Sequence, residues 1–220
     1  MVGRARSLSL LLRALVLAAA LPGGASNGQA QESDPSLTGA PTVEEGTGQE
    51  LRIGSFYVDR YEYPNRRGSR PAVSVTWAEA QALCQSRGKR LCTEAEWEMA
   101  ARGRQGLSYG YGSEFEPGRC NTPYLTSSGD WHRGGTAASG QYEGCQSDYG
   151  VADMIGNVWE WTDGWYDSTK SWRVVRGGSW FNSVNFARAD GRYGRHLTAD
   201  FAVDLVGFRC CRSAVEVESD

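Results

Sequence analysis

The segment from Asp153 to Thr162 combines residue types that could bind a hard metal ion. Its sequence is Asp-Met-Ile-Gly-Asn-Val-Trp-Glu-Trp-Thr, so Asp153 and Glu160 flank a Gly-Asn turn. Calcium favours a shell of oxygen atoms from carboxylates, carbonyls and water. The pattern is less specific than a complete EF-hand loop. It allows two interpretations: a calcium-binding turn, or a buried aromatic turn in which Glu160 is hydrogen-bonded and no metal binds.

Two short helices should help to position this segment. The Thr-x-x-Glu sequences at 76–79 and 93–96 fit the capping box, in which the Thr and Glu side chains satisfy amides at a helix start. We expect helices over residues 77–86 and 94–102, each followed by a glycine. Cys84 lies on the apolar face of the first helix and should point into the core.

Strands are expected around these helices. Aromatic and β-branched residues predict strands over 55–63, at Val174-Val175 and over 208–212. Residues 103–150 are rich in Gly, Ser and aromatic residues without periodicity, which is unusual for plain loop in a compact domain. We expect disulfides or ligands to hold this stretch, which could line a groove or a metal site. The alternative is that it is mobile.

The N-terminal residues 1–30 have the features of a secretory signal peptide. Arginines precede an apolar run over residues 8–21, and small residues follow it. Cleavage is expected after Ala30, or alternatively after Ala25. A membrane anchor is disfavoured because Arg13 interrupts the apolar run. We therefore expect a secreted or periplasmic protein with no membrane span after cleavage.

The rest of the chain divides by composition. Residues 31–50 are Gly, Ser, Thr, Pro and acidic residues, so we expect a flexible linker. Residues 51–213 are enough for one domain with its own core, and residues 214–220 form an acidic tail. The formal net charge is −3 and there is no basic stripe, which argues against nucleic acid as a partner.

Six cysteines in an exported chain predict three disulfides. Spacing alone does not select one pairing. If Cys210 and Cys211 lie on one strand, they face opposite sides of it and must have different partners. A zinc site is the alternative, but no Cys-x-x-Cys spacing supports it.

Four segments together resemble the formylglycine-generating enzyme family, also called sulfatase-modifying factors. They are the Asp153–Thr162 segment, Lys89-Arg-Leu-Cys-Thr-Glu-Ala-Glu-Trp-Glu98, Arg176-Gly-Gly-Ser-Trp180 and Gly207-Phe-Arg-Cys210. They occur in the family's order with similar separations, and the resemblance runs from about Gly54 to Arg212. It implies a disulfide-bonded α+β fold, related to C-type lectins, with little regular secondary structure.

The resemblance also implies a disulfide pairing and structural calcium. It pairs Cys84 with Cys210, which would leave Cys92 with Cys211 and Cys120 with Cys145. One family calcium site corresponds to the side chains of Asp153 and Glu160 with the carbonyls of Gly156 and Val158. A second would involve Asn121, Thr122 and Asp130, with His132 as a further carbonyl ligand, although the spacing there departs from the family.

Copper is not carried over by the resemblance. Family members that make formylglycine hold copper(I) through two cysteines after the Gly-Gly-Ser block, and this soft ion selects thiolates. The matching positions here are Asn182 and Ala187, and neither residue can supply a thiolate. We therefore expect no copper site and no formylglycine synthesis.

Other catalytic sites have less support. The related ergothioneine-type sulfoxide synthases use a three-histidine iron site, whereas this chain has only His132 and His196. A hydrolytic triad could be drawn from Ser179, His196 and Asp200 or Asp204. Triads are recognised by geometry, and no nucleophile-elbow signal supports this one.

A binding groove is the remaining expectation. The family's groove binds an extended peptide beside the Gly-Gly-Ser-aromatic block, which here implies the candidates Ser179, Trp180, Asn182, Asn185 and Arg188. Alternatively, Trp180 is a core residue and the asparagines form turns. We expect a binding or accessory module for a peptide, protein or glycan in the cell envelope. The alternatives are an envelope oxidoreductase that tailors a secreted metabolite or protein, and a purely structural domain.

Overall fold

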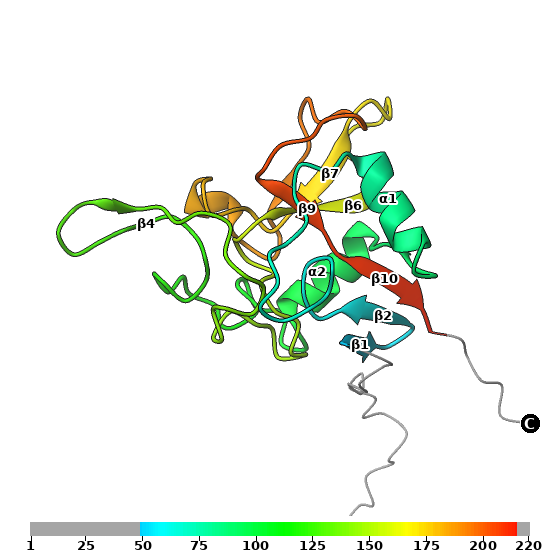
Figure 1. The fold of residues 1–220 in the computed structure, drawn as a ribbon. Coiled ribbons are helices and arrows are strands. Elements are labelled where there is room, and N and C mark those ends of the chain that lie inside the picture. Colours follow the sequence, from blue (N-terminus) through cyan, green and yellow to red (C-terminus); the bar gives the residue numbers. More distant parts are fainter. Residues whose placement is uncertain (1–48, 215–220) are drawn as a thin grey trace, which may run out of the picture. The chain divides into compact units, whose positions relative to one another are not determined.

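The computed structural model describes residues 49–214, which form two four-stranded sheets, a small hairpin and two α-helices (Figure 1). The first sheet has the order β1-β2-β10-β3, with the bounds Glu50–Ile53, Phe56–Asp59, Cys210–Ser213 and Arg90–Leu91. The second has the order β8-β7-β6-β9, with the bounds Arg192–Tyr193, Arg173–Arg176, Trp159–Trp165 and Val206–Phe208. The expected signal peptide, most of the expected linker and residues 215–220 lie outside the described residues. The mixed architecture with few helices and three disulfides confirms the predicted disulfide-bonded α+β fold.

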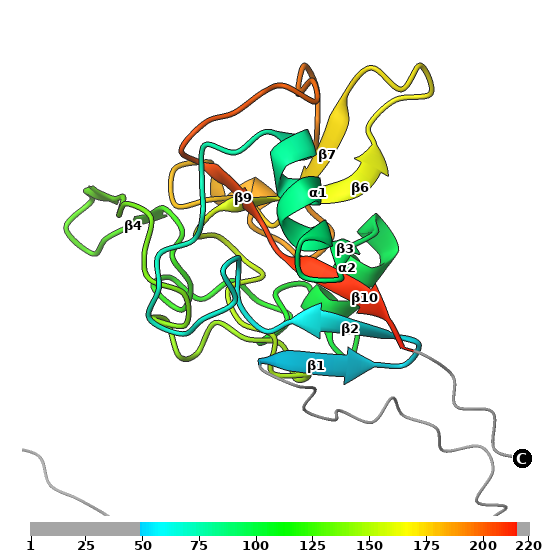
Figure 2. The same ribbon diagram turned by 45° about the vertical axis from the view of Figure 1, so that its right-hand side comes forward.

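The C-terminal strands connect the two sheets. β9 pairs with β6 in parallel, and β10 pairs antiparallel with both β2 and β3 (Figure 2). Only Arg209 separates β9 from β10, so the strand predicted over 208–212 is in fact two strands that belong to different sheets. The junction therefore places one arginine between the two sheets.

Both predicted helices are present. α1 spans Trp77–Gln85 and α2 spans Glu94–Arg102, each with a capping box. At α1 the Glu79 amide donates to the Thr76 hydroxyl, and the Thr76 amide donates to the Glu79 carboxylate. These bonds satisfy amides that have no partner within the helix.

The two faces of β10 contact different parts of the core. Cys210 bonds Cys84 of α1, within a cluster that also holds Trp77, Trp161 and Phe208. On the other face Cys211 bonds Cys92, beside Leu51, Val58 and Trp97. The third disulfide joins Cys120 to Cys145. The first is the pair that the family resemblance implies, and the other two are the pairs expected from the remaining cysteines.

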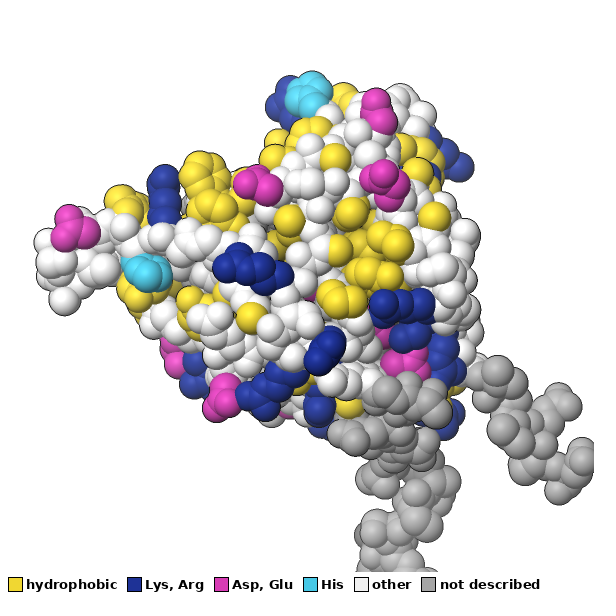
Figure 3. Space-filling view, viewed as in Figure 1, with side chains coloured by type: hydrophobic (Ala, Val, Ile, Leu, Met, Phe, Trp, Pro, Cys, Tyr) yellow, Lys and Arg dark blue, Asp and Glu magenta, His cyan; other side chains and the backbone are white. Residues whose placement is uncertain are grey.

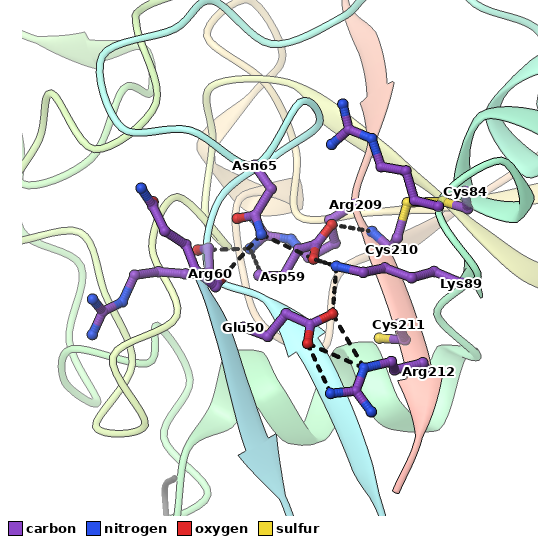
Figure 4. A network of polar contacts seen from close by, with 12 residues as sticks. Glu50, Asp59, Arg60, Asn65, Cys84, Lys89, Arg209, Cys210, Cys211 and Arg212 are labelled. Carbon is purple, nitrogen blue, oxygen red and sulfur yellow. Dashed lines mark hydrogen bonds and ion pairs between the residues drawn. A yellow bond between two sulfur atoms is a disulfide. The ribbon is translucent and has the colours of Figure 1, made fainter. Parts of the chain in front are cut away.

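Glu50 belongs to the domain, although its composition placed it in the linker. It begins β1, is 3% exposed and lies opposite Asp59 of β2. Lys89 reaches between the two carboxylates, with its Nζ 2.5 Å from an oxygen of each, and Arg212 also pairs with Glu50 (Figure 4). Because like charges that face each other across strands are destabilising, the Lys89 ammonium is needed to hold β1 on β2.

Residues 103–150 contain little regular structure, as predicted. Two short strands, β4 (Tyr124–Leu125) and β5 (Trp131–His132), pair as a hairpin. This hairpin projects from the domain in Figure 1. The Cys120–Cys145 disulfide closes this region.

A short 3-10 helix, η2, spans Val184–Phe186. Within the described part of the chain, no helix is long and apolar enough to cross a membrane.

Candidate functional site: a recess around Asn182

The loop after β7 carries Asn182 and turns back on itself. Gly177 and Gly178 both have positive φ, at 90° and 77°, a backbone region that favours glycine. A Cβ at Gly178 would lie 2.9 Å from the Cα of Ala187. The loop can therefore close only with glycine here, and this closure brings Ala187 against the start of the loop.

The Asn182 side chain is fixed by two hydrogen bonds. The indole Nε1 of Trp159 donates to Asn182 Oδ1 at 2.6 Å, and the hydroxyl of Ser179 lies 2.5 Å from the same oxygen. An amide oxygen has two lone pairs, so these contacts use its full acceptor capacity. The amide group of Asn182 is thereby held at one orientation beside the indole.

Asn182 lines a recess whose walls are mostly aromatic. One cavity of about 220 Å³ is lined by Trp159, Asn182, Phe186 and Tyr193. A second, of about 130 Å³, shares Trp159, Asn182 and Tyr193 and extends over apolar residues of the C-terminal segment, including Leu197, Phe201 and Leu205. Hydrophobic side chains gather over the η2 segment on the face shown in Figure 3. An apolar recess with a few polar groups is the usual form of a small-ligand site.

Only part of the predicted groove set lines this recess. Ser179 is buried and supports Asn182 from behind, and Trp180 is half-buried with its Nε1 buried and without a hydrogen-bond partner. Asn185 is exposed on η2. Arg188 forms an ion pair with Asp190 and is not among the lining residues.

Sequence reasoning missed three of the residues that line the recess: Trp159, Phe186 and Tyr193. Trp159 belongs to the Asp153–Thr162 segment, whose residue types predict a metal site and not an aromatic wall. Its alternation with Trp161 along β6 could have indicated a shared apolar face. Tyr193 carries no comparable local signal, because it reaches the recess only through the pairing of β8 with β7.

Glu160 lies on the opposite face of β6 and faces Arg209. Both of its carboxylate oxygens accept from this guanidinium, at 2.6 and 2.7 Å, and Oε2 also accepts from the Trp97 indole at 2.6 Å. Arg209 donates its remaining N–H groups to the carbonyls of Asp59, Arg60 and Ala152. Both members of this ion pair are almost completely buried. The arrangement matches the interpretation in which Glu160 is hydrogen-bonded within a buried turn.

Asp153 and Glu62 complete a buried acidic group with Glu160. Asp153 Oδ2 accepts from the Gly140 amide at 2.6 Å, and Glu62 accepts from Ser139 and Asn157. Burial, reinforced by the neighbouring Asp153, raises the pKa of Glu62 to about 8. Burial is also the main reason that the pKa of Asp153 is raised to about 6.

The donor types of the first predicted calcium site fit the ion, but Glu160 is engaged elsewhere. A cation bound by Asp153, Glu160 and the carbonyls of Gly156 and Val158 would have to compete with Arg209 for the Glu160 carboxylate. Among the described residues, no group of three or more His, Cys, Asp or Glu side chains is arranged to hold a metal ion. Calcium at this turn stays a prediction.

The residues of the second predicted calcium site differ in environment. Asn121 and Thr122 are buried, and Asn121 donates to the side chain of Asn157 and to the carbonyl of Gly135. Asp130 is exposed in the turn between β4 and β5, where it accepts from Ser128. The side chains of Asn121 and Asp130 are thus bonded within separate parts of the loop.

The two histidines do not join a catalytic group in the described structure. His132 is exposed and stacks on Tyr124, and His196 is exposed against Trp172. Ser179 is buried and bonded to Asn182, while Asp200 and Asp204 are exposed. The triad drawn from sequence is therefore not assembled.

The family model of the sulfatase-modifying factor enzyme 1-like domain matches residues 25–214. The chain belongs to this family. It is 41% identical over 159 residues to the inactive C-alpha-formylglycine-generating enzyme 2 of Bos taurus, covering 66% of this chain and 50% of the relative. It is 35% identical over 175 residues to the formylglycine-generating enzyme of Streptomyces coelicolor, covering 67% and 54%. The chain thus spans about half the length of the curated relatives it matches.

Solved structures agree on the fold of this family member. PvdO from Pseudomonas aeruginosa has a TM-score of 0.52 at 23% identity, covering 80% of this chain and 73% of that one. The crystal structure of CarF has a TM-score of 0.55 at 20% identity, and the match covers 73% of this chain and 87% of CarF. At these identities the likeness concerns the fold alone.

Asn182 and Ala187 are the two positions that the family resemblance matches to the copper-binding cysteines. The resemblance places the first copper-binding cysteine at Asn182, which is the amide held by Trp159 and Ser179, and the second at Ala187, which is fully buried. All six cysteines of this chain are in disulfides, so none supplies a thiolate elsewhere in the oxidised protein.

Proposed function

We propose that this chain is an exported sulfatase-modifying-factor-type domain that binds a peptide, protein or glycan in the cell envelope and does not make formylglycine. This proposal rests on the hydrogen bonds that hold the Asn182 side chain. An amide bonded to an indole and a hydroxyl occupies the position at which the family's enzymes need a copper-binding thiolate. Copper(I) selects soft sulfur ligands, whereas the atoms of an amide are hard ligands.

The walls of the recess support a binding role. Trp159, Phe186 and Tyr193 form a surface around an amide of fixed orientation. Rigid aromatic walls lose little conformational entropy when a ligand binds, so they favour recognition. The domain keeps a preformed site although the residues for copper chemistry are different.

Export is supported by the cysteine chemistry. Three disulfides that join distant parts of the chain are typical of proteins in oxidising compartments. Calcium is proposed as a structural ion at the Asp153–Glu160 turn, where it would bind only if Glu160 released its contact with Arg209.

Peptide binding tests the proposed function. A fluorescent Cys-x-Pro-x-Arg peptide, the sulfatase-type sequence, would be titrated with the purified oxidised domain, and its anisotropy followed. We expect saturable binding that Phe186→Ala and Asn182→Ala weaken, with Asn185→Ala, exposed on η2 and not among the lining residues, as a matched control. Binding that neither recess substitution changes would contradict the proposed site. Thermal unfolding of each variant shows whether the fold is intact.

A further inference from the structure

Three aromatic rings that line the recess form a nearly equilateral triangle. The ring centroids of Trp159 and Phe186 are 5.8 Å apart, and the ring centroid of Tyr193 lies 5.9 Å from each of them. The planes are tilted by 58°, 37° and 70°, so the rings are not stacked in parallel. Together with Asn182 they line the cavity of about 220 Å³.

We propose that this aromatic triangle binds a quaternary ammonium group, that is, a fully methylated nitrogen cation on a small molecule or side chain. The inference rests on the proposed binding function and names the chemical class of the ligand.

The geometry allows one cation to contact all three rings. Sides of 5.8–5.9 Å put each centroid about 3.4 Å from the centre of the triangle, so a nitrogen up to roughly 5 Å above that centre stays within about 6 Å of every centroid. Within that distance an aromatic ring attracts a cation that lies over its face, through its quadrupole. Trp, the most effective ring type for this attraction, is one of the three.

The polar groups of the recess select a methylated cation over a primary ammonium. A lysine ammonium carries three N–H donors that need acceptors. The Asn182 oxygen already accepts from Trp159 and Ser179, so the Tyr193 hydroxyl is the one side-chain acceptor left among the described lining residues, and none of these residues is charged. A quaternary ammonium has no N–H group and loses no hydrogen bond when it leaves water for this site.

The rings are also held in advance of binding. Trp159 is 5% exposed and bonded to Asn182, and Tyr193 lies on β8, which pairs with β7. Phe186 is 38% exposed on η2 and forms the outer wall. The apolar second cavity continues from the same walls and could receive the methyl or methylene groups that adjoin the cation.

The test compares choline with 3,3-dimethylbutan-1-ol, which has the same shape but carbon in place of the charged nitrogen. Tryptophan fluorescence and calorimetry would follow titration of the oxidised domain with each compound. We expect choline to bind between about 3-fold and 30-fold more tightly than the alcohol, because only the cation gains from the ring quadrupoles. Phe186→Leu should remove most of this preference, whereas Phe181→Leu, an exposed aromatic outside the recess, should leave it unchanged.

Several results would overturn the inference. They are equal or tighter binding of the alcohol, absence of choline binding at millimolar concentration, and a preference that survives Phe186→Leu in a variant with the unfolding temperature of the unsubstituted protein. The peptide titration described above is independent of these results. A domain that binds the peptide but not choline would keep its proposed function and lose only the ammonium ligand.

Discussion

The Trp159 indole and the Asn182 amide form a direct hydrogen bond of 2.6 Å across the recess. Trp159 belongs to the Asp153–Thr162 segment, and Asn182 belongs to the loop after the Gly-Gly-Ser block. The bond therefore joins two of the segments that carry the family resemblance. We propose that Asn182 stands where the family's formylglycine-forming enzymes have a copper-binding cysteine.

The buried pair of Arg209 and Glu160 should be essential for folding. Glu160→Gln would remove the carboxylate that forms a bidentate ion pair with the buried Arg209 guanidinium, and we expect a loss of about 3–5 kcal/mol in the free energy of unfolding. Denaturant unfolding measures this loss. Arg67→Ala, in the exposed Arg67–Glu143 pair, is the control and should cost less than about 1 kcal/mol. A Glu160→Gln cost as small as that of the control would contradict the account.

Stability should fall as pH rises towards 8 because of Glu62. Its pKa is raised by burial from 4.5 to about 8, so the folded state binds a proton that the unfolded state has lost over this range. The stabilisation that protonated Glu62 gives to the folded state is fully present below about pH 4.5, and it is lost as the pH rises through the folded-state pKa.

Glu62→Gln separates this effect from other titrations. Gln can donate to the Ser139 hydroxyl and accept from Asn157, so it imitates the protonated acid. With EDTA present, the variant should have a higher unfolding temperature than the unsubstituted protein at pH 8 and a similar one at pH 5. Parallel pH profiles for the two proteins would show that Glu62 does not titrate as proposed.

Calcium should raise the unfolding temperature if it binds at the Asp153–Glu160 turn. At a hundred times its dissociation constant, a bound ion adds about 2.7 kcal/mol to the stability of the folded state. The measurement is thermal unfolding after EDTA treatment, then with added calcium, with magnesium as the control ion. Asp153→Asn keeps an acceptor for the Gly140 amide and an oxygen ligand but removes the charge, so it should weaken the response. No response in the unsubstituted protein would mean that Arg209 alone neutralises this turn.

The sequence predicted those features that depend on local patterns. Both capping boxes and the bounds of α2 were predicted because Thr and Glu at this spacing satisfy helix-start amides regardless of context. β7 was indicated by Val174-Val175. The family resemblance implies the Cys84–Cys210 pair, and the other two pairs match those expected from the remaining cysteines, whereas spacing alone leaves the pairing open.

Features that depend on distant partners were not predictable in this way. Glu50 appeared to be linker because its acidic side chain is buried only through Lys89 and Arg212. Arg209 divides one predicted strand into two, since its guanidinium must reach Glu160 between the sheets. The wall of the recess combines β6, η2 and β8, three elements separated along the chain. No local periodicity reports such a combination.

We infer that this domain does not carry out copper-dependent oxidation, and an oxidation assay with a peptide substrate tests this inference. The oxidised domain would be loaded with copper(I) and incubated in air with a Cys-x-Pro-x-Arg peptide, while oxygen uptake and peptide mass are followed. The formylglycine-generating enzyme of Streptomyces coelicolor serves as the positive control. We predict no oxygen uptake above the protein-free rate and an unchanged peptide mass. Conversion of the peptide cysteine to an aldehyde would contradict the assignment of Asn182 and Ala187 and restore an enzymatic function.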